Sequence, residues 1–232
     1  MKMKWGALVV DGRGKIGGQV ASKNRSGAYL RTKVTPVNPQ TSSQLGVRNR
    51  FTGFSQAWSG LTQAQRDAWN AAVGDFAKTN IFGDIINPTG FNLYQRLNNN
   101  LSLAGQAALT LPPLPEAVEQ LEATALSVED ATVASSFELT TTGNLSAASG
   151  VKVFATPPLS AGKNFVKSEY RLIKVSAAPI ASPADLLADY QAKFGSVGVA
   201  GQKIFVKVQV VNLNTGQVGT PSQVSTIVVA SA

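Results

Sequence analysis

Residues 12–50 of the chain read GRGKIGGQVASKNRSGAYLRTKVTPVNPQTSSQLGVRNR, and they decide how the first part of the chain folds. Turns are expected at residues 11–14 and 24–27, where Asp, Asn and Gly tolerate the backbone angles of a hairpin. Strands are predicted over residues 4–10, 15–23 and 28–34. Together they form an antiparallel β-meander. Because a few short strands with few large apolar residues are marginally stable, we expect this meander to need a partner surface, either the following helices or another subunit.

Positive charge is concentrated in the first 50 residues. This segment holds ten Lys and Arg and one acid, Asp11, whereas the remaining residues hold eleven bases and twelve acids. The alternative explanation for such asymmetry is solubility and chance, but we favour a surface that binds a polyanion or an acidic protein. The residues predicted to carry the contact are Arg13, Lys15, Lys23, Arg25, Arg31, Lys33, Arg48 and Arg50.

The composition argues against most enzyme classes. The chain has neither Cys nor His, which excludes disulfides, thiolate nucleophiles, cysteine zinc sites and imidazole acid–base chemistry. The carboxylates are scattered and form no recognisable catalytic pair, so we expect no catalytic residue, no metal site and no cofactor. No apolar run reaches the roughly 18 residues of a membrane span, and we expect a soluble protein that is made in a cytoplasm.

The glycines of the first segment also raise the possibility of a nucleotide-binding loop. Gly12, Gly14 and Gly17 have the GxGxxG spacing. However, Lys15 is not followed by the Ser or Thr of a P-loop, and strand-like sequence stands where a dinucleotide fold requires a helix. We therefore attribute these glycines to hairpin geometry.

The next region is predicted to be helical. Asn38 can cap a helix that starts at Pro39 and runs to about residue 59, and this Asn38-Pro39 pair forms an elbow after the meander. A second helix follows Thr62, which with Gln65 has the pattern of a capping box. A third is expected over residues 90–104, after Thr89. The aromatic residues of these helices fall at helical spacing, so core packing is favoured over base stacking.

The second half of the chain shows the two-residue alternation of β-strands. Strands are predicted over residues 118–128, 134–142, 150–157, 169–177, 203–212 and 222–230. One helix, from Ser182-Pro183 to Phe194, crosses between two of them. The fold class is therefore α+β. Its predicted ranges are a basic meander (1–37), a helical region (38–110), a proline-rich linker (111–117) and an antiparallel β-sandwich (118–232) of about the size of a fibronectin type III domain.

Several motifs of the N-terminal half carry a resemblance. They are GKIGG (14–18), NRSGAYLR (24–31), PVNPQT (36–41), Gln44, Arg48 and LTQAQRDAW (61–69). In this order they resemble a family of small proteins that bacteriophages and prophages encode, typically among structural genes. The resemblance covers about residues 6–75. The second half is similar in architecture to the immunoglobulin-like or fibronectin-like modules that phage virion proteins often carry.

The resemblance and the charge pattern together predict a non-enzymatic virion structural protein. It would be made in the host cytoplasm, associate with the capsid or head, and be present in many copies. The basic segment and the elbow would dock on other virion proteins, on copies of this chain or on packaged DNA. The alternatives are a free nucleic-acid-binding protein that uses the same basic segment, and a glycan-binding or adhesion module carried by the sandwich. We expect no small-molecule substrate.

Overall fold

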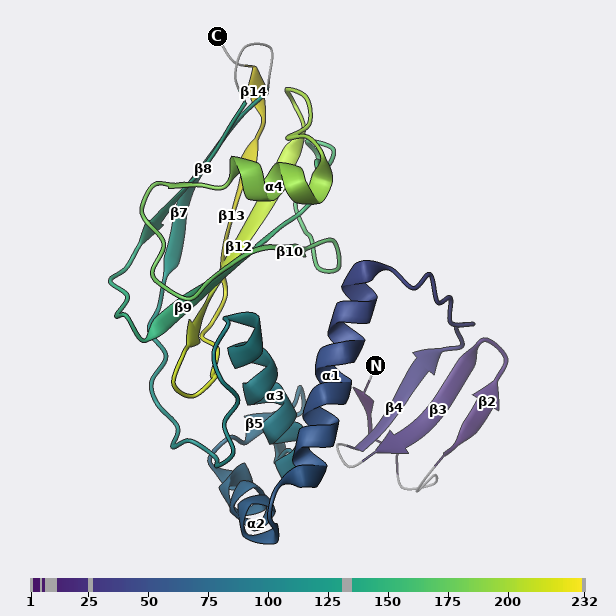
Figure 1. The fold of residues 1–232 in the computed structure, drawn as a ribbon. Coiled ribbons are helices and arrows are strands. Elements are labelled where there is room, and N and C mark those ends of the chain that lie inside the picture. The colour runs from purple at the N-terminus through teal and green to yellow at the C-terminus, as the bar shows by residue number, and fades with distance from the viewer. Residues whose placement is uncertain (1, 5, 7–11, 25–26, 131–134, 231–232) are drawn as a thin grey trace. The chain divides into compact units, whose positions relative to one another are not determined.

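The structure is a computed structural model that describes residues 2–4, 6, 12–24, 27–130 and 135–230 (Figure 1). By its internal contacts the chain divides into two compact units. Unit 1 comprises Met1–Asn49 and Ala77–Asn87, and unit 2 comprises Arg50–Phe76 and Pro88–Ala232. This division differs from the four predicted ranges. One boundary falls inside the first helix, and residues 77–87, which follow the second helix, belong to unit 1 rather than to unit 2.

Unit 1 contains a four-stranded antiparallel sheet. Its order is β1 (Lys2–Met3), β4 (Gly27–Thr32), β3 (Gln19–Asn24) and β2 (Gly14–Ile16). The predicted continuous strand over residues 15–23 is wrong, because Gly17-Gly18 form a two-residue turn between β2 and β3. Ile16 pairs with Gln19 across it, and Gly17 has a φ of 54°, which glycine adopts without steric cost.

Two other predictions for this sheet fall partly on residues that the structure does not describe. Asn24 pairs with Gly27 at the two ends of the predicted turn, and residues 25–26 of that turn lie outside the described part of the chain. Most of the predicted strand over residues 4–10, and Asp11 of the first predicted turn, also lie outside it. Unit 1 further contains a small hairpin of β5 (Lys78–Thr79) and β6 (Ile85–Ile86).

The long helix α1 (Ser42–Gly60) begins three residues later than predicted. The hydroxyl of Thr41 accepts the N–H of Gln44 at 3.3 Å, and its carbonyl accepts that of Leu45 at 2.9 Å. Thr41 thus satisfies backbone donors at the helix start. Gln40 has a φ of 51°, a conformation that cannot continue into a right-handed helix. The prediction that Asn38 caps a helix starting at Pro39 is therefore wrong.

The other two predicted helices of this region are confirmed. α2 (Gln63–Ala71) has both hydrogen bonds of the Thr62–Gln65 capping box, and it continues into a short 3₁₀ turn, η1 (Ala72–Gly74). α3 (Gly90–Leu103) begins with the Thr89 hydroxyl accepting the N–H of Asn92 at 3.1 Å.

The aromatic residues of this region form a core, as predicted. Trp69 is 0% and Tyr94 2% exposed, and their rings meet edge to face at 5.3 Å between centroids. The indole N–H of Trp69 donates to the carbonyl of Thr110 at 2.9 Å, which satisfies the one polar group of that side chain. The same cluster contains Leu61, Phe76, Leu93 and Leu97. Because Trp69 and Tyr94 are enclosed, neither is available to stack on bases.

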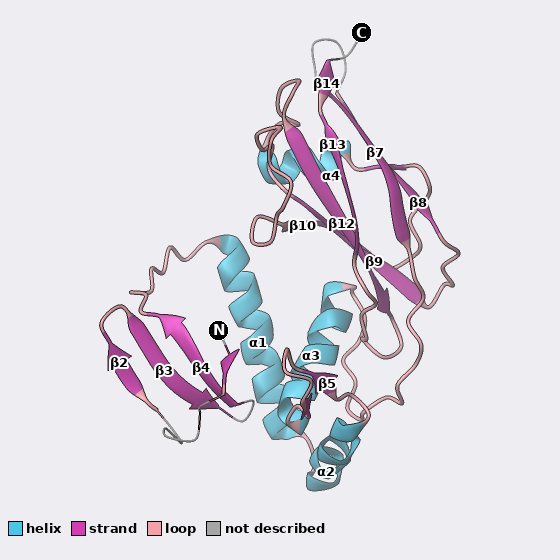
Figure 2. Ribbon diagram, turned by 180° about the vertical axis from the view of Figure 1, so that it is seen from behind, coloured by secondary structure: helices cyan, strands magenta, loops and turns pink. Residues whose placement is uncertain are grey.

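The rest of unit 2 contains two four-stranded sheets (Figure 2). The first has the order β10 (Arg171–Ser176), β9 (Ser149–Ala155), β12 (Lys203–Asn212) and β13 (Ser222–Ile227). The second has the order β11 (Ala184–Asp185), β8 (Ser136–Thr142), β7 (Glu122–Asp130) and β14 (Val229–Ala230). Neighbouring strands are antiparallel except β14 and β7, which are parallel. The described chain therefore belongs to the mixed α and β class with antiparallel sheets.

Both sheets contribute to one hydrophobic core. Inward residues such as Val151 and Val208 of the first sheet and Phe137 and Leu139 of the second are all fully buried. The crossover helix α4 (Leu187–Phe194) begins later than predicted, because Ala184–Asp185 first pair with β8 as strand β11. Its Tyr190 ring stacks on Phe137 at 4.6 Å between centroids, and its hydroxyl donates to the carbonyl of Thr156 at 2.9 Å.

The helical core and the two sheets are joined closely within unit 2. The Asn100 side chain of α3 donates to the carbonyl of Gly216 at 2.8 Å and accepts a proton of Lys152 Nζ at 2.7 Å. Residues 111–117, predicted as a linker, are also bound to this part of the chain, since Glu116 accepts the Asn212 amide at 2.8 Å. These bonds explain why α3 and the sheets form one compact unit.

Candidate functional site

The pairing register of the unit 1 sheet places several cations on one face. Lys15 lies opposite Val20, and Val20 lies opposite Arg31. Directly paired residues share a face, so Lys15 and Arg31 flank Val20, with their Cα atoms about 10 Å apart across three strands. The next row on this face contains Ser22, Tyr29 and Lys2.

Lys33 extends the same face beyond the end of β4. Its backbone N–H donates to the carbonyl of Gly18 at 2.8 Å, which continues the pairing of β3 with β4. Side chains alternate along a strand, so Lys33 lies on the side of Arg31. We call the side with Lys2, Lys15, Arg31 and Lys33 the basic face.

The basic face presents its charges to solvent. Lys15, Arg31 and Lys33 are exposed, while Val20 and Tyr29 are half-buried between them. The described strands of this sheet contain no carboxylate. Like charges at this spacing are about one Debye length apart at physiological salt, so they repel one another only weakly. Together they attract a surface or polymer that carries several negative charges.

The eight predicted contact residues do not form a single surface. Lys23 pairs with Ala28 and therefore lies on the opposite face, with the buried Ala21. Arg13 is exposed and immediately precedes β2, and Arg25 lies outside the described residues. The sequence interpretation missed the Gly17-Gly18 turn, and without that turn the alternation of sides along residues 15–23 is counted wrongly.

The two arginines of α1 differ from each other. Arg48 is exposed, whereas Arg50 is half-buried and belongs to unit 2. Arg50 lies near Lys152, which is only 4% exposed. Burial first, and then the charge of Arg50, lower the pKa of Lys152 to about 8. Arg50 thus lies close enough to Lys152 for the two like charges to repel each other, and Lys152 is a charged residue that sequence reasoning did not single out.

The structure describes both predicted elbow residues, and neither of them caps a helix. Asn38 and Pro39 are exposed and precede α1 in a non-helical segment.

Elsewhere in unit 1, Lys4 forms an ion pair with Asp84 at 3.2 Å. Hydrogen bonds from the Asn80 side chain, and next from Lys4, lower the pKa of the Asp84 carboxyl. This carboxylate stabilises the loop between β5 and β6, where Asn80 also accepts the N–H groups of Phe82 and Asp84.

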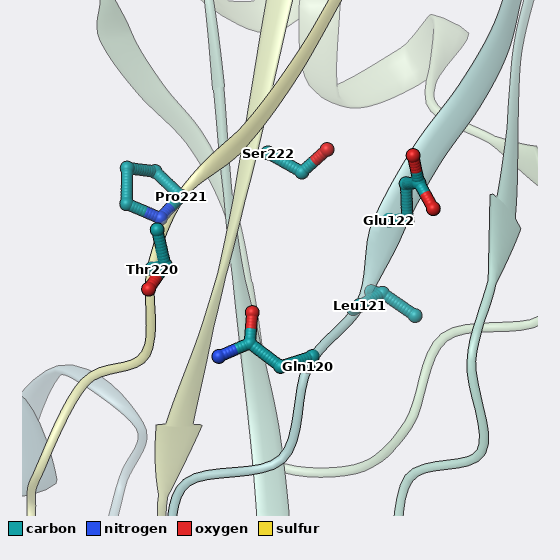
Figure 3. A pocket seen from close by; sticks show the side chains of 6 residues that line it. All are labelled: Gln120, Leu121, Glu122, Thr220, Pro221 and Ser222. Carbon is teal, nitrogen blue, oxygen red and sulfur yellow. The ribbon is translucent and has the colours of Figure 1, made fainter.

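A small pocket of about 270 Å³ lies in unit 2, where the segments leading into β7 and β13 run side by side (Figure 3). It is lined by Gln120, Leu121, Glu122, Thr220, Pro221 and Ser222. The backbone N–H of Ala123 donates to the Ser222 hydroxyl at 3.1 Å, so that hydroxyl already takes part in a structural hydrogen bond. With one carboxylate and neutral side chains, the lining offers no acid–base or nucleophilic pair.

Two further features of the described residues bear on function. No group of three or more Asp, Glu, His or Cys residues among them lies close enough to hold a metal ion. No helix in the described ranges is both long and apolar enough to cross a membrane. Comparison of this chain with protein-family models, with curated proteins and with solved structures found no match.

Proposed function

We propose that this chain is a non-enzymatic structural protein of a bacteriophage virion, associated with the capsid or head, that attaches through its basic face. The observation that carries the proposal is the row of Lys15, Val20 and Arg31, extended by Lys2 and Lys33, on a sheet whose described strands contain no carboxylate. The motif order over residues 6–75, with its resemblance to phage-encoded proteins, supports the same reading.

The architecture of unit 1 supports an assembly role. Within the described residues of its sheet, the buried apolar side chains are those of Ala21 and Ala28, which are too small to hold a stable core. Val20 and Tyr29 remain half-exposed among the cations. A surface of this kind gains stability when a partner covers it.

The two sheets of unit 2 would form an immunoglobulin-like or fibronectin-like module. The support for this assignment is that two mainly antiparallel sheets share one core of alternating inward residues, which is how such modules are built. In an assembled particle this module would face outward or contact neighbouring subunits.

The test is incorporation into particles. Purified, salt-washed virions of the source phage are analysed by quantitative mass spectrometry, with peptide intensities scaled to the major capsid protein. We expect many copies of the wild-type chain and a loss of at least tenfold for the Lys15→Glu/Arg31→Glu variant. Lys23→Glu, on the opposite face of the same sheet, is the matched control. Wild-type absence from particles would refute the proposal, as would equal incorporation of all variants.

A second candidate function is nucleic-acid binding by the free protein. It is favoured by Tyr29, which lies between Arg31 and Lys2 on the basic face, because an aromatic ring among cations can stack on an unpaired base. Binding of a single-stranded oligonucleotide would weaken steeply with salt and would fall further in Tyr29→Leu. Binding that is absent at low salt removes this candidate.

A further inference from the structure

The second sheet of unit 2 has an outer face of the opposite charge. Asp185 of β11 lies directly opposite Glu138 of β8, which in turn lies opposite Ser127 of β7. The neighbouring residue Leu139 is fully buried in the core. Because side chains alternate along a strand, the row of Asp185, Glu138 and Ser127 points away from the core.

Further carboxylates lie on this side of the sheet. Glu129 pairs with Ser136 and is diagonal to Glu138, while Glu122 pairs with Thr142. The positions between them are occupied by Ser, Thr and Ala. The sequence has no Lys or Arg between residues 97 and 151. We call the outward side with Glu122, Glu129, Glu138 and Asp185 the acidic face.

The charges of the acidic face are not neutralised within the described chain. Glu122, Glu129 and Glu138 form no ion pair with any residue that the structure describes. Asp185 accepts the backbone N–H of Leu187 at 2.9 Å but has the like charge of Glu138 directly opposite, an arrangement that destabilises a sheet. A partner carrying several separated positive charges would relieve this repulsion.

The basic face of the same chain has the matching properties. Both faces are outward sides of short antiparallel strands, so strand pairing sets the spacing of the charges on each. Paired strands place Asp185 and Glu138 about 5 Å apart and Glu138 and Glu129 about 7–8 Å apart. Lys15 and Arg31 lie about 10 Å apart. Each face carries four charges of one sign and small or half-buried side chains between them.

We propose that the basic face of one copy binds the acidic face of β7, β8 and β11 on a second copy of this chain. This inference rests on the proposed function, because it names the partner through which the structural protein assembles. The two faces are different surfaces, so the contact is head-to-tail, and it closes into a ring or continues as a filament according to the rotation between copies. Its electrostatic character makes it sensitive to salt.

The experiment is sedimentation velocity of the full chain over a range of concentrations, at about 30 mM and about 500 mM salt. We expect concentration-dependent oligomers at low salt that dissociate at high salt. Lys15→Glu/Arg31→Glu and, separately, Glu138→Lys/Asp185→Lys should each weaken association by roughly tenfold or more. Lys193→Glu, on the exposed side of α4, is the control and should associate as the wild type does.

Mixing tests the two faces directly, with double variants whose far-UV circular dichroism matches that of the wild type. Equal amounts of the two double variants should associate with each other, since each retains one native face that fits the other's, whereas neither associates well alone. A four-fold variant that carries all the changes should regain association. A wild-type chain that stays monomeric at low salt overturns the inference, as does failure of the mixture. If the basic face is still needed for incorporation into virions, the proposed function stands with a different protein as partner.

Discussion

The sheet of unit 1 and the two sheets of unit 2 are built from similar strands but are stabilised very differently. In unit 2, seventeen buried apolar residues from both sheets and the α4 region share one core. In the described sheet of unit 1, Ala21 and Ala28 are the buried apolar residues. Stability therefore resides in the core of unit 2, whereas the described strands of unit 1 expose charge on a sheet with little core of its own.

The largest expected effect comes from breaking the core of unit 2. Phe137 is fully buried and stacks on Tyr190, so Phe137→Ala should lower the free energy of unfolding by about 3–5 kcal/mol. Denaturant unfolding followed by far-UV circular dichroism measures the change. Phe165→Ala is the control, because Phe165 is 76% exposed, and its change should stay near zero. Equal losses for both would contradict this assignment of the core.

The next effect tests the packing of α3 against the sheets. Gly216 has a φ of 72°, and a Cβ at this position would lie 2.4 Å from the carbonyl oxygen of Leu97. Gly216→Ala should therefore cost about 2–3 kcal/mol, from both backbone strain and the displaced helix. Gly105→Ala is matched to it, since Gly105 has a φ of 73° with open space around it. A similar loss for both would show that the contact with α3 adds nothing.

The buried Lys152 predicts a pH dependence. Burial and the charge of Arg50 lower its pKa from 10.5 to about 8, so the unfolded chain binds more protons at this lysine between those values. The free energy of unfolding contributed by Lys152 should then rise with pH from about 8 to 10.5, by about 1–3 kcal/mol.

Comparison with Lys152→Met isolates this contribution, because every other titrating group is common to both proteins. The difference in unfolding free energy between wild type and variant should shift in favour of the wild type between pH 7 and pH 10. Urea titrations at the two pH values measure it. A difference that is constant with pH would mean that Lys152 is solvated in the folded protein.

Loss of a helix cap should have a smaller effect. Thr62 completes both hydrogen bonds of the capping box at the start of α2, and Thr62→Ala should cost about 1 kcal/mol. Thr62→Ser keeps the accepting hydroxyl and is the matched control, expected within about 0.5 kcal/mol of the wild type. Thermal unfolding of the three proteins gives the comparison, and a Ser variant as unstable as the Ala variant would exclude the cap as the cause.

The same contrast between the units explains which features could be predicted from the sequence. The capping box, the aromatic helical core and most strands of unit 2 follow from local chemistry and periodicity, and they are confirmed by Thr62, Trp69 and the alternation in β8. The late start of α1 depends on the positive φ of Gln40, which no residue preference indicates. β11 and β14 have two residues each, too few to show a period.

The sequence predicted which segment holds the cations of the candidate site, but not which of those cations share a face. Counting Lys and Arg located the basic segment, yet the face on which each lies depends on the register, and a one-residue change reverses it. The Gly17-Gly18 turn changes that register, which places Lys23 apart from Lys15 and Arg31. Arg50 lies close to Lys152 although about a hundred residues of sequence separate them, which charge patterning along the chain cannot reveal.

The smallest change in stability is expected on the basic face itself. Lys15 and Arg31 are exposed and have no carboxylate on the described strands beside them, so Lys15→Gln/Arg31→Gln should alter the unfolding free energy by no more than about 0.5 kcal/mol. Lys23→Gln, on the opposite face, should do the same.

The two variants should differ in binding, since only the first removes charge from the basic face. Calorimetric unfolding together with sedimentation at low salt measures both properties on one sample. If both variants lose association equally, net charge rather than the arrangement of the face drives it. If the first variant also unfolds far more easily, these cations stabilise unit 1 instead of serving recognition.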